Sequence, residues 1–322
     1  LIDNSIDAKS SQIDIFIEDG GHKSIQVFDN GIGMIKEDLE LAFQRHATSK
    51  IETQDDLGKI NTLGFRGEAL PSIGSVSRVV LTSRAFGSQE GWQLGVDGGK
   101  KFEPKPAAHP QGTSVEVSDL FYATPARLKF LKTERTEMNH TTDAVKRLAM
   151  AHPNIAFTLL NGERHILKVS STQGDFLSTR LDRLDAIMGN EFGLNALTID
   201  AEREGLRLTG HAGLPTLNRG NASLQYLFVN DRSVRDKLFF GAVRGAYRDF
   251  LAHDRYPLLA LFLEVPPDAL DVNVHPAKTE VRFRDPGLVR GLIVSALKHA
   301  LAGAGHRAST TVSQAALGAL QS

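Results

Sequence analysis

The 322-residue chain has no cysteine, a single tryptophan and only 7% aromatic residues. Without cysteine it can form no disulfide, no cysteine-ligated zinc or iron–sulfur site, and no thiol nucleophile. No uninterrupted apolar run approaches the roughly 18 residues that cross a bilayer, so the sequence predicts a soluble protein without a membrane span. The lack of cysteine fits a cytoplasmic location. The chain also lacks a Gly-x4-Gly-Lys-Ser/Thr loop, so any nucleotide site must be built differently.

The chain contains enough sequence for two domains. A small polar stretch at 170–175 predicts the boundary between a first domain at 1–172 and a second at 173–303, and 304–322 read as the start of a flexible linker. Hydrophobic periodicity predicts strands at 13–17, 24–28, 79–83, 113–117, 156–169 (around Asn161-Gly162), 206–212, 224–229 and 258–265, and helices at 1–8, 36–44, 68–75, 134–151, 234–251 and 288–302. This mixture predicts α+β layers and not a regular doubly wound sheet.

Charge differs between the two halves of the chain. Residues 201–322 carry 15 basic and 11 acidic side chains, whereas residues 1–200 carry 22 basic and 27 acidic ones. A mildly basic second half is compatible with nucleic-acid contact. A difference this small is also typical of two domains with different solvated faces, and both interpretations stay open.

The segment Asp29-Asn30-Gly31-Ile32-Gly33 directly follows a predicted strand. Asp-Asn-Gly is a common hairpin turn, which is one interpretation. In the other, the glycines remove side chains where a flat ring approaches, and the Asp29 carboxylate accepts a hydrogen bond from an exocyclic amino group such as that of adenine.

Two further segments are compatible with phosphate and metal binding. The glycine-bracketed loop LGFRGEAL at 63–70 leads into a predicted helix, whose free N–H groups could bind phosphate; alternatively Arg66 is simply solvated. Asn4 lies on the first predicted helix. Its amide oxygen suits Mg²⁺, although an asparagine on a helix is more often an ordinary surface residue.

These segments belong to a longer ordered series. NSIDA, DNGIG, RHATSKI, LGFRGEAL and QGTSVEV follow one another between Asn4 and Val117 and resemble the ATPase domain of the GHKL superfamily. LGFRGEAL, LFYATPARLKFL at 120–131 and DVNVHPAKTEVRF at 271–283 resemble the MutL branch of that superfamily, the DNA mismatch repair proteins. The resemblance extends to about Ala302. It implies a GHKL (Bergerat) ATPase α/β sandwich, truncated at its N-terminus, followed by a smaller α+β transducer domain of the ribosomal-protein-S5-like type.

The resemblance also implies a site for ATP and Mg²⁺. Asn4 would coordinate Mg²⁺, Asp29 would bind the adenine amino group, and the Thr113 hydroxyl would support the adenine end. Lys278 would reach the γ-phosphate from the second domain, a role that suits the compact charge of lysine, and is the implied catalytic residue. The remaining implied nucleotide-binding residues are Gly31 and Gly33 at the adenine pocket, and Thr48, Ser49, Lys50, Gly64, Phe65, Arg66 and Gly67 in a lid over the phosphates.

One departure concerns the general base. The family uses a glutamate on the first helix, which would be the residue immediately before Leu1. Asp3 adjoins Asn4 and points to a different face of the helix, so it is a poor substitute. We therefore expect a chain that begins at Leu1 to keep most nucleotide contacts and to have little or no hydrolytic activity.

A basic cluster in the second half is the candidate DNA surface. It consists of Arg232, Arg235, Lys237, Arg244 and Arg248. These side chains could contact phosphates without reading bases, or they could form an ordinary solvated helix face. The resemblance implies DNA binding without sequence preference, homodimerisation on ATP binding, and cooperation with the mismatch-recognition protein MutS and a downstream repair nuclease or helicase, away from any membrane.

The predicted function is an ATP-dependent conformational switch that binds and slowly hydrolyses ATP in DNA mismatch repair. The ATPase region of a type II topoisomerase shares the fold and a transducer lysine, but GFRGEAL and FYATPAR argue against it. A DNA-binding scaffold without ATP turnover is a second alternative. A histidine kinase is disfavoured because no phospho-acceptor helix precedes the nucleotide motifs.

Overall fold

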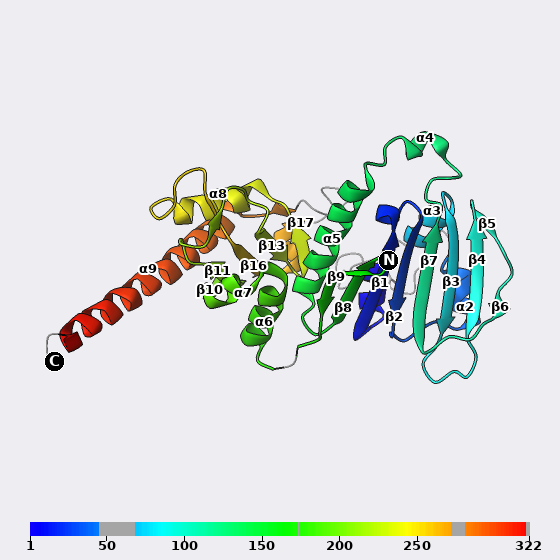
Figure 1. The fold of residues 1–322 in the computed structure, drawn as a ribbon, viewed down its shortest axis with the longest axis horizontal. Helices are drawn as coiled ribbons and strands as arrows, with labels where there is room; N and C mark the ends of the chain where they lie inside the picture. The colour runs from blue at the N-terminus through cyan, green and yellow to red at the C-terminus, as the bar shows by residue number, and fades with distance from the viewer. Residues whose placement is uncertain (45–67, 173, 272–280, 320–322) are drawn as a thin grey trace. The chain divides into compact units, whose positions relative to one another are not determined.

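The computed structural model describes residues 1–44, 68–172, 174–271 and 281–319. The chain divides into two compact units, Leu1–Gln173 and Gly174–Ser322. Each unit has its own β-sheet and its own covering helices (Figure 1).

The first unit is built on a nine-stranded sheet of order β5-β4-β3-β7-β2-β1-β8-β9, with β6 paired to β4 (Figure 1). Its strands are β1 (Gln12–Glu18), β2 (Ser24–Asp29), β3 (Arg78–Arg84), β4 (Trp92–Asp97), β5 (Lys100–Lys101), β6 (Lys105–Pro106), β7 (Gly112–Ser118), β8 (Ala156–Asn161) and β9 (Arg164–Val169). The β1–β8 pair is parallel and the other pairs are antiparallel. The sequence predicted most of these strands but gave no prediction for β4, β5 and β6.

Helices cover one face of this sheet. Apolar residues at every second position of the strands explain why, because they place apolar side chains on that face. On β3, Val79 and Leu81 are almost fully buried, and they pack with Leu39 and Leu70 in one apolar cluster. One buried face and one polar face is the usual outcome for an antiparallel sheet covered on one side. The helices of this unit are α1 (Ile2–Asp7), α2 (Lys36–Leu41), α3 (Ala69–Gly74), α4 (Pro125–Leu128) and α5 (Glu134–Ala151), with a 3₁₀ turn at Asp19–Gly21.

The second unit has a five-stranded sheet of order β10-β11-β16-β13-β14, in which only β13 and β16 are parallel. Its strands are β10 (Ala196–Arg203), β11 (Leu206–Gly213), β13 (Gln225–Val229), β14 (Arg232–Val234) and β16 (Leu259–Glu264), with short pairs between β12 (Asn218–Arg219) and β15 (Tyr256–Pro257) and between β17 (Leu270–Asp271) and β18 (Arg282–Phe283). Its helices are α6 (Phe176–Met188), α7 (Asn190–Leu194), α8 (Lys237–Tyr247) and α9 (Pro286–Ala319), and a 3₁₀ turn covers Pro267–Ala269. Apolar side chains of α8 and α9 pack with those of the sheet in one buried core.

Helix α9 has two features that the sequence analysis did not anticipate. Its segment Pro286–Ala304 is long and apolar enough to cross a membrane by length and composition alone. However, Val289, Ile293 and Leu297 of this segment are buried in the core of the second unit, which is the packing of a core helix. The helix also continues to Ala319, through residues for which the sequence predicted a flexible linker.

Candidate functional site

Three polar side chains lie next to one another on neighbouring strands of the first sheet. Asp29 on β2 is paired in register with Thr113 on β7, and Thr113 is paired with Ser83 on β3. Residues opposite one another in antiparallel strands project from the same face, so the three side chains share one face. Leu81, two residues before Ser83 and therefore on that face, is fully buried. This group of three, which we call the polar row, thus adjoins the apolar core.

The Asp29 carboxylate is held by two hydrogen bonds. Its Oδ2 accepts from the Ser5 hydroxyl at 2.7 Å, and its Oδ1 accepts from the Gly31 N–H at 2.9 Å. The first bond ties helix α1 to strand β2, and the second closes the turn after β2. A carboxylate offers about four acceptor positions, so Asp29 has capacity left for a ligand donor.

The two glycines of the turn are required by the protein's own backbone. A Cβ at Gly31 would lie 2.7 Å from the carbonyl oxygen of Ala8, at the end of α1. Gly33 has φ +66°, and a Cβ there would lie 2.0 Å from the carbonyl oxygen of Arg84. The loop therefore packs between α1 and the end of β3. Contacts within the protein therefore account for both glycines, and no bound ligand ring is needed to explain them. The same contacts place Asp29 at the beginning of a tightly held turn.

A third glycine brings Thr113 close to Asp29. Gly112 has φ +119°, and a Cβ there would lie 2.0 Å from the carbonyl oxygen of Asp29. The Thr113 side chain is nearly buried, and its hydroxyl lies 2.9 Å from that of Ser83. The structure thus brings Thr113 next to Asp29, which lies 84 positions earlier in the sequence and begins the turn that contains Gly31 and Gly33.

Asn4 lies on α1, directly before the serine that bonds to Asp29. Among the residues that the structure describes, no group of three histidine, aspartate or glutamate side chains could hold a metal ion. A single amide oxygen from Asn4 fits Mg²⁺, which keeps several waters and takes one or two protein oxygens plus substrate phosphates.

The other predicted nucleotide contacts lie outside the described residues. They are Thr48, Ser49, Lys50, Gly64, Phe65, Arg66, Gly67 and Lys278. Description of the chain resumes at Glu68, which directly precedes α3.

Sequence reasoning missed Ser5 and Ser83 as parts of the site. Ser5 lies within the NSIDA motif, next to Asn4, so its neighbourhood was a usable signal. Nothing in the segment RVVLTSR distinguishes Ser83, because its importance arises only from the register between β3 and β7.

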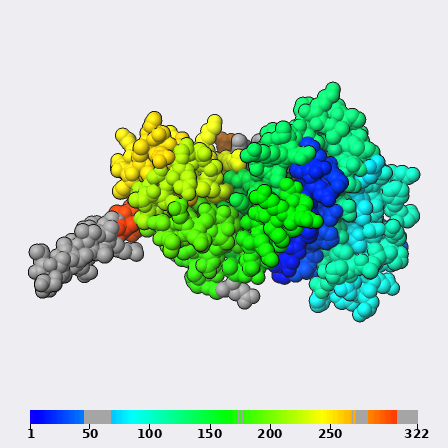
Figure 2. Space-filling model, in the orientation of Figure 1, coloured from blue at the N-terminus to red at the C-terminus, as the bar shows by residue number. Residues whose placement is uncertain are grey.

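The predicted basic cluster forms a surface on and beside α8. Lys237, Arg244 and Arg248 are exposed and lie along one face of the helix, whereas Phe239 and Val243 face the core. The Arg244 guanidinium donates to the Tyr256 hydroxyl at 3.0 Å, which fixes its direction. We call Lys237, Arg244 and Arg248 the α8 stripe. Figure 2 shows the α8 segment, in yellow-green and yellow, at the surface of the second unit.

The other two members of the cluster precede the helix. Arg235 is exposed and Arg232, on β14, is half-buried. Asp236 caps α8 by accepting from the Leu238 N–H at 2.7 Å, so a carboxylate lies between the two arginines and the stripe.

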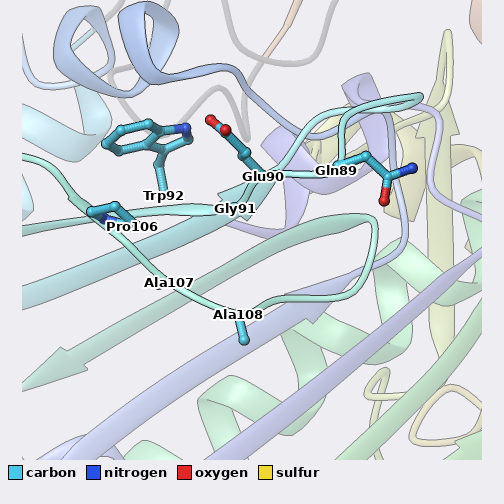
Figure 3. A pocket seen from close by; sticks show the side chains of 7 residues that line it. All are labelled: Gln89, Glu90, Gly91, Trp92, Pro106, Ala107 and Ala108. Carbon is cyan, nitrogen blue, oxygen red and sulfur yellow. The ribbon is translucent and has the colours of Figure 1, made fainter.

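A hollow at the β4–β6 edge has a different character. It encloses about 460 Å³ and is lined by residues 89–92 and 106–108. Figure 3 shows the Trp92 and Pro106 side chains on neighbouring strands, in agreement with their register. The lining includes Glu90, contains no basic side chain and includes none of the predicted nucleotide contacts. It is therefore a poor candidate for binding phosphate.

Comparison with known proteins gives two family matches, one in each unit. Residues 1–119 match the family described as histidine kinase-, DNA gyrase B-, and HSP90-like ATPase. Residues 184–302 match the family described as DNA mismatch repair protein, C-terminal domain.

Curated relatives match along the whole chain. The chain is 64% identical over 321 residues to a DNA mismatch repair protein MutL from Rhodospirillum rubrum, covering 100% of this chain and 51% of that protein. It is 60% identical over 320 residues to the MutL of Paramagnetospirillum magneticum, covering 99% of this chain and 53% of that protein. The chain therefore spans about half the length of these relatives.

Two solved structures have a similar fold along most of this chain. The Aquifex aeolicus MutL ATPase domain complexed with ADP superposes with a TM-score of 0.63 at 28% identity, covering 91% of this chain and 92% of that one. The N-terminal domain of a DNA repair protein gives a TM-score of 0.75 at 25% identity, covering 93% and 91%.

The fold, the polar row and these matches define a GHKL-type ATPase domain followed by a transducer domain, which confirms the predicted fold class. The chain belongs to the MutL family of DNA mismatch repair proteins. Membership in this family argues against the type II topoisomerase and histidine kinase alternatives.

Proposed function

We propose that the first unit binds Mg²⁺–ATP, with adenine against the polar row. The pairing of Asp29 with Thr113 supports this proposal most directly. It places a carboxylate and a hydroxyl on one sheet face, and adenine carries an exocyclic amino group that needs acceptors. Asp29 is already oriented by Ser5 and Gly31, so little ordering is left for the moment of binding.

Titration with ATP tests the adenine contact. Asp29→Asn replaces one acceptor oxygen by a donor, so ATP affinity should fall at least tenfold, about 1.4 kcal/mol. Asp14→Asn is the matched control, because Asp14 lies on the neighbouring β1 and its side chain bonds to Gln12 rather than to the polar row. ATP binding by Asp29→Asn at the affinity of the unchanged protein would contradict the proposal.

Asn4 is the proposed Mg²⁺ ligand, through its amide oxygen. When bound, the ion would neutralise charge on the phosphates. Asn4→Ala should therefore weaken ATP binding in the presence of Mg²⁺ and leave binding in the presence of a chelator nearly unchanged. An equal loss under both conditions would show that Asn4 acts through helix α1 and not through the metal ion.

We further propose that ATP binding drives a conformational switch. Lys50 and Gly64–Gly67 are the proposed lid and Lys278 the proposed γ-phosphate contact, on the strength of the family resemblance. In the full-length protein, slow ATP hydrolysis would then reverse the switch. Hydrogen exchange distinguishes the switch from a passive DNA scaffold: ATP should slow exchange at Lys50 and at Gly64–Gly67, whereas a scaffold would show the same exchange with and without ATP.

In the full-length protein, we propose that this switch controls homodimerisation and contact with DNA. The α8 stripe, with Arg232 and Arg235, would bind phosphates without sequence preference. Coupling to the mismatch-recognition protein MutS and to a downstream nuclease or helicase, in the cytoplasm, follows from the family. The test is the sedimentation of the protein with and without a non-hydrolysable ATP analogue. A change from monomer to dimer is expected, and an unchanged monomer would contradict nucleotide-driven dimerisation.

A further inference from the structure

Ser83 joins three parts of the candidate nucleotide site. Its side chain is fully buried. Its Oγ lies 2.8 Å from the carbonyl oxygen of Gly112, 2.9 Å from Oγ1 of Thr113 and 2.8 Å from the amide nitrogen of Met34. The partners belong to β7 and to the loop that follows Asp29, so one hydroxyl connects β3, β7 and that loop.

The direction of each of these hydrogen bonds follows from counting protons. A serine hydroxyl has one proton and two acceptor positions. The Gly112 carbonyl can only accept, so it takes the Ser83 proton, while the Met34 N–H donates to one lone pair. The remaining contact, with Thr113, then requires the Thr113 proton to point at Ser83. Thr113 consequently has only lone pairs to offer a ligand.

We propose that Ser83 is a positioning residue that selects adenine by fixing the direction of the Thr113 hydroxyl. The proposal rests on the proposed ATP site. With Thr113 held as an acceptor beside the Asp29 carboxylate, the row favours a ring that presents the 6-amino group. A 6-oxo ring, as in hypoxanthine or guanine, would place a carbonyl oxygen against acceptors. A binding site discriminates strongly against a ligand that leaves polar groups of the site without a hydrogen-bond partner.

Binding of ATP and of inosine triphosphate (ITP), which differs at position 6, tests the selection. Ser83→Ala releases the Thr113 hydroxyl, so the ratio of ATP to ITP affinity should fall about fivefold, the range of one hydrogen bond. Thr82→Ala is the matched control. Thr82 is the preceding residue on β3, is nearly buried and contributes a hydroxyl that accepts from Gln93 Nε2 at 3.1 Å, on the other face of the sheet. It should leave the ratio unchanged.

Two further measurements separate positioning from general destabilisation. Ser83→Thr keeps a hydroxyl and should retain the ATP preference. In the absence of nucleotide, Ser83→Ala should speed hydrogen exchange of the Met34 amide, which loses its acceptor, and Thr82→Ala should not. If Ser83→Ala does not fold, Ser83→Cys replaces it, because a thiol is a weak hydrogen-bonding group of similar shape and should also lower the ratio.

A double-mutant comparison provides the remaining test. Thr113→Val removes the oriented hydroxyl, so adding Ser83→Ala to it should lower the ATP to ITP ratio no further. Independent, additive losses would overturn the proposal, as would an unchanged ratio in Ser83→Ala or an equal fall in Thr82→Ala. Asp29→Asn distinguishes failure of the proposed ATP site from failure of the proposed adenine selection by Ser83. If Asp29→Asn leaves ATP binding intact, the proposal of an ATP site at the polar row is wrong. If it abolishes binding while Ser83→Ala keeps the ratio, only the selection by Ser83 is wrong.

Discussion

The Ser5 hydroxyl donates a 2.7 Å hydrogen bond to Oδ2 of Asp29 and so connects helix α1 to strand β2. Ser5 is nearly buried and Asp29 is half-buried, so water competes little for this bond. Because Asn4 adjoins Ser5, the same bond fixes the position of the proposed Mg²⁺ ligand relative to the proposed adenine contact. One serine thus links the two ends of the candidate nucleotide site.

Loss of this bond should affect both stability and ATP binding. Ser5→Ala removes a hydrogen bond to a charged group, which is worth about 1.5–3 kcal/mol, and leaves Asp29 less well oriented. Ser10→Ala is the matched control, because Ser10 is equally buried but donates to the Ser5 carbonyl oxygen, at 2.7 Å. Urea unfolding and ATP titration should show a stability loss in both variants and a clear affinity loss in Ser5→Ala alone. Equal affinity losses would argue that α1 acts only as a structural support.

Replacing Gly33 by alanine should destabilise the protein far more than replacing Gly87, although both glycines have a positive φ. Gly33→Ala combines a positive φ of +66° with a Cβ 2.0 Å from a backbone oxygen. We expect a loss of about 3 kcal/mol or more, from strain plus displacement of the loop. Gly87 has φ +74° but open space around its Cβ position, so Gly87→Ala should cost only about 1 kcal/mol. Similar unfolding midpoints for the two variants would show that the loop moves away from β3 easily.

Local sequence signals predicted local structure well, and non-local relationships poorly. The alternating residues at 13–17 and 24–28 correctly predicted β1 and β2, because alternation reports one buried face. Strand β10 and helix α6 had usable signals that were missed: Leu197, Ile199 and Ala201 alternate, and Asp175 caps α6 by accepting from the Ser178 N–H. The sequence therefore contains the local signals that predict β10 and α6.

The candidate site shows the opposite limit. The family motifs named Asp29 and Thr113, but no local pattern indicates that they are cross-strand partners. That pairing depends on the register of β2 with β7, which is set by the packing of the whole sheet face. Ser83 enters the site only through the next register, between β7 and β3.

Reversing charge on the α8 stripe should weaken DNA binding. Arg244→Glu with Arg248→Glu removes two cations that would pair with phosphates, so affinity for a random-sequence duplex should fall. The salt dependence of binding should flatten by roughly one unit in the logarithmic slope for each phosphate that is no longer neutralised. Arg164→Glu with Lys168→Glu, at two exposed positions on β9 of the first unit, makes the same charge change and is the matched control. Equal weakening by this control pair would indicate an effect of total charge and not of the α8 stripe.

Acidification should destabilise the second unit through His211. Burial on β11, and secondly the positive charge of Arg180, lower the pKa of this imidazole to about 4 from its usual value near 6.5. Between these two values the unfolded chain binds a proton that the folded chain does not. The free energy of unfolding should therefore fall by up to about 1.4 kcal/mol per pH unit as the pH decreases from 6.5 towards 4, while this contribution is constant above 6.5.

Denaturant unfolding followed from pH 7 to pH 4 isolates this contribution. His211→Gln removes the titrating group, so its stability should decrease less steeply with acidification than that of the unchanged protein, whatever its stability at pH 7. His299→Gln makes the same replacement at an exposed position on α9 and is the control. Carboxylates titrate in the same pH range in all three proteins, so the difference between slopes belongs to the histidine. If His211→Gln retains the full pH dependence, the imidazole takes up its proton over the same pH range in the folded and the unfolded chain, and the lowered pKa of His211 is wrong.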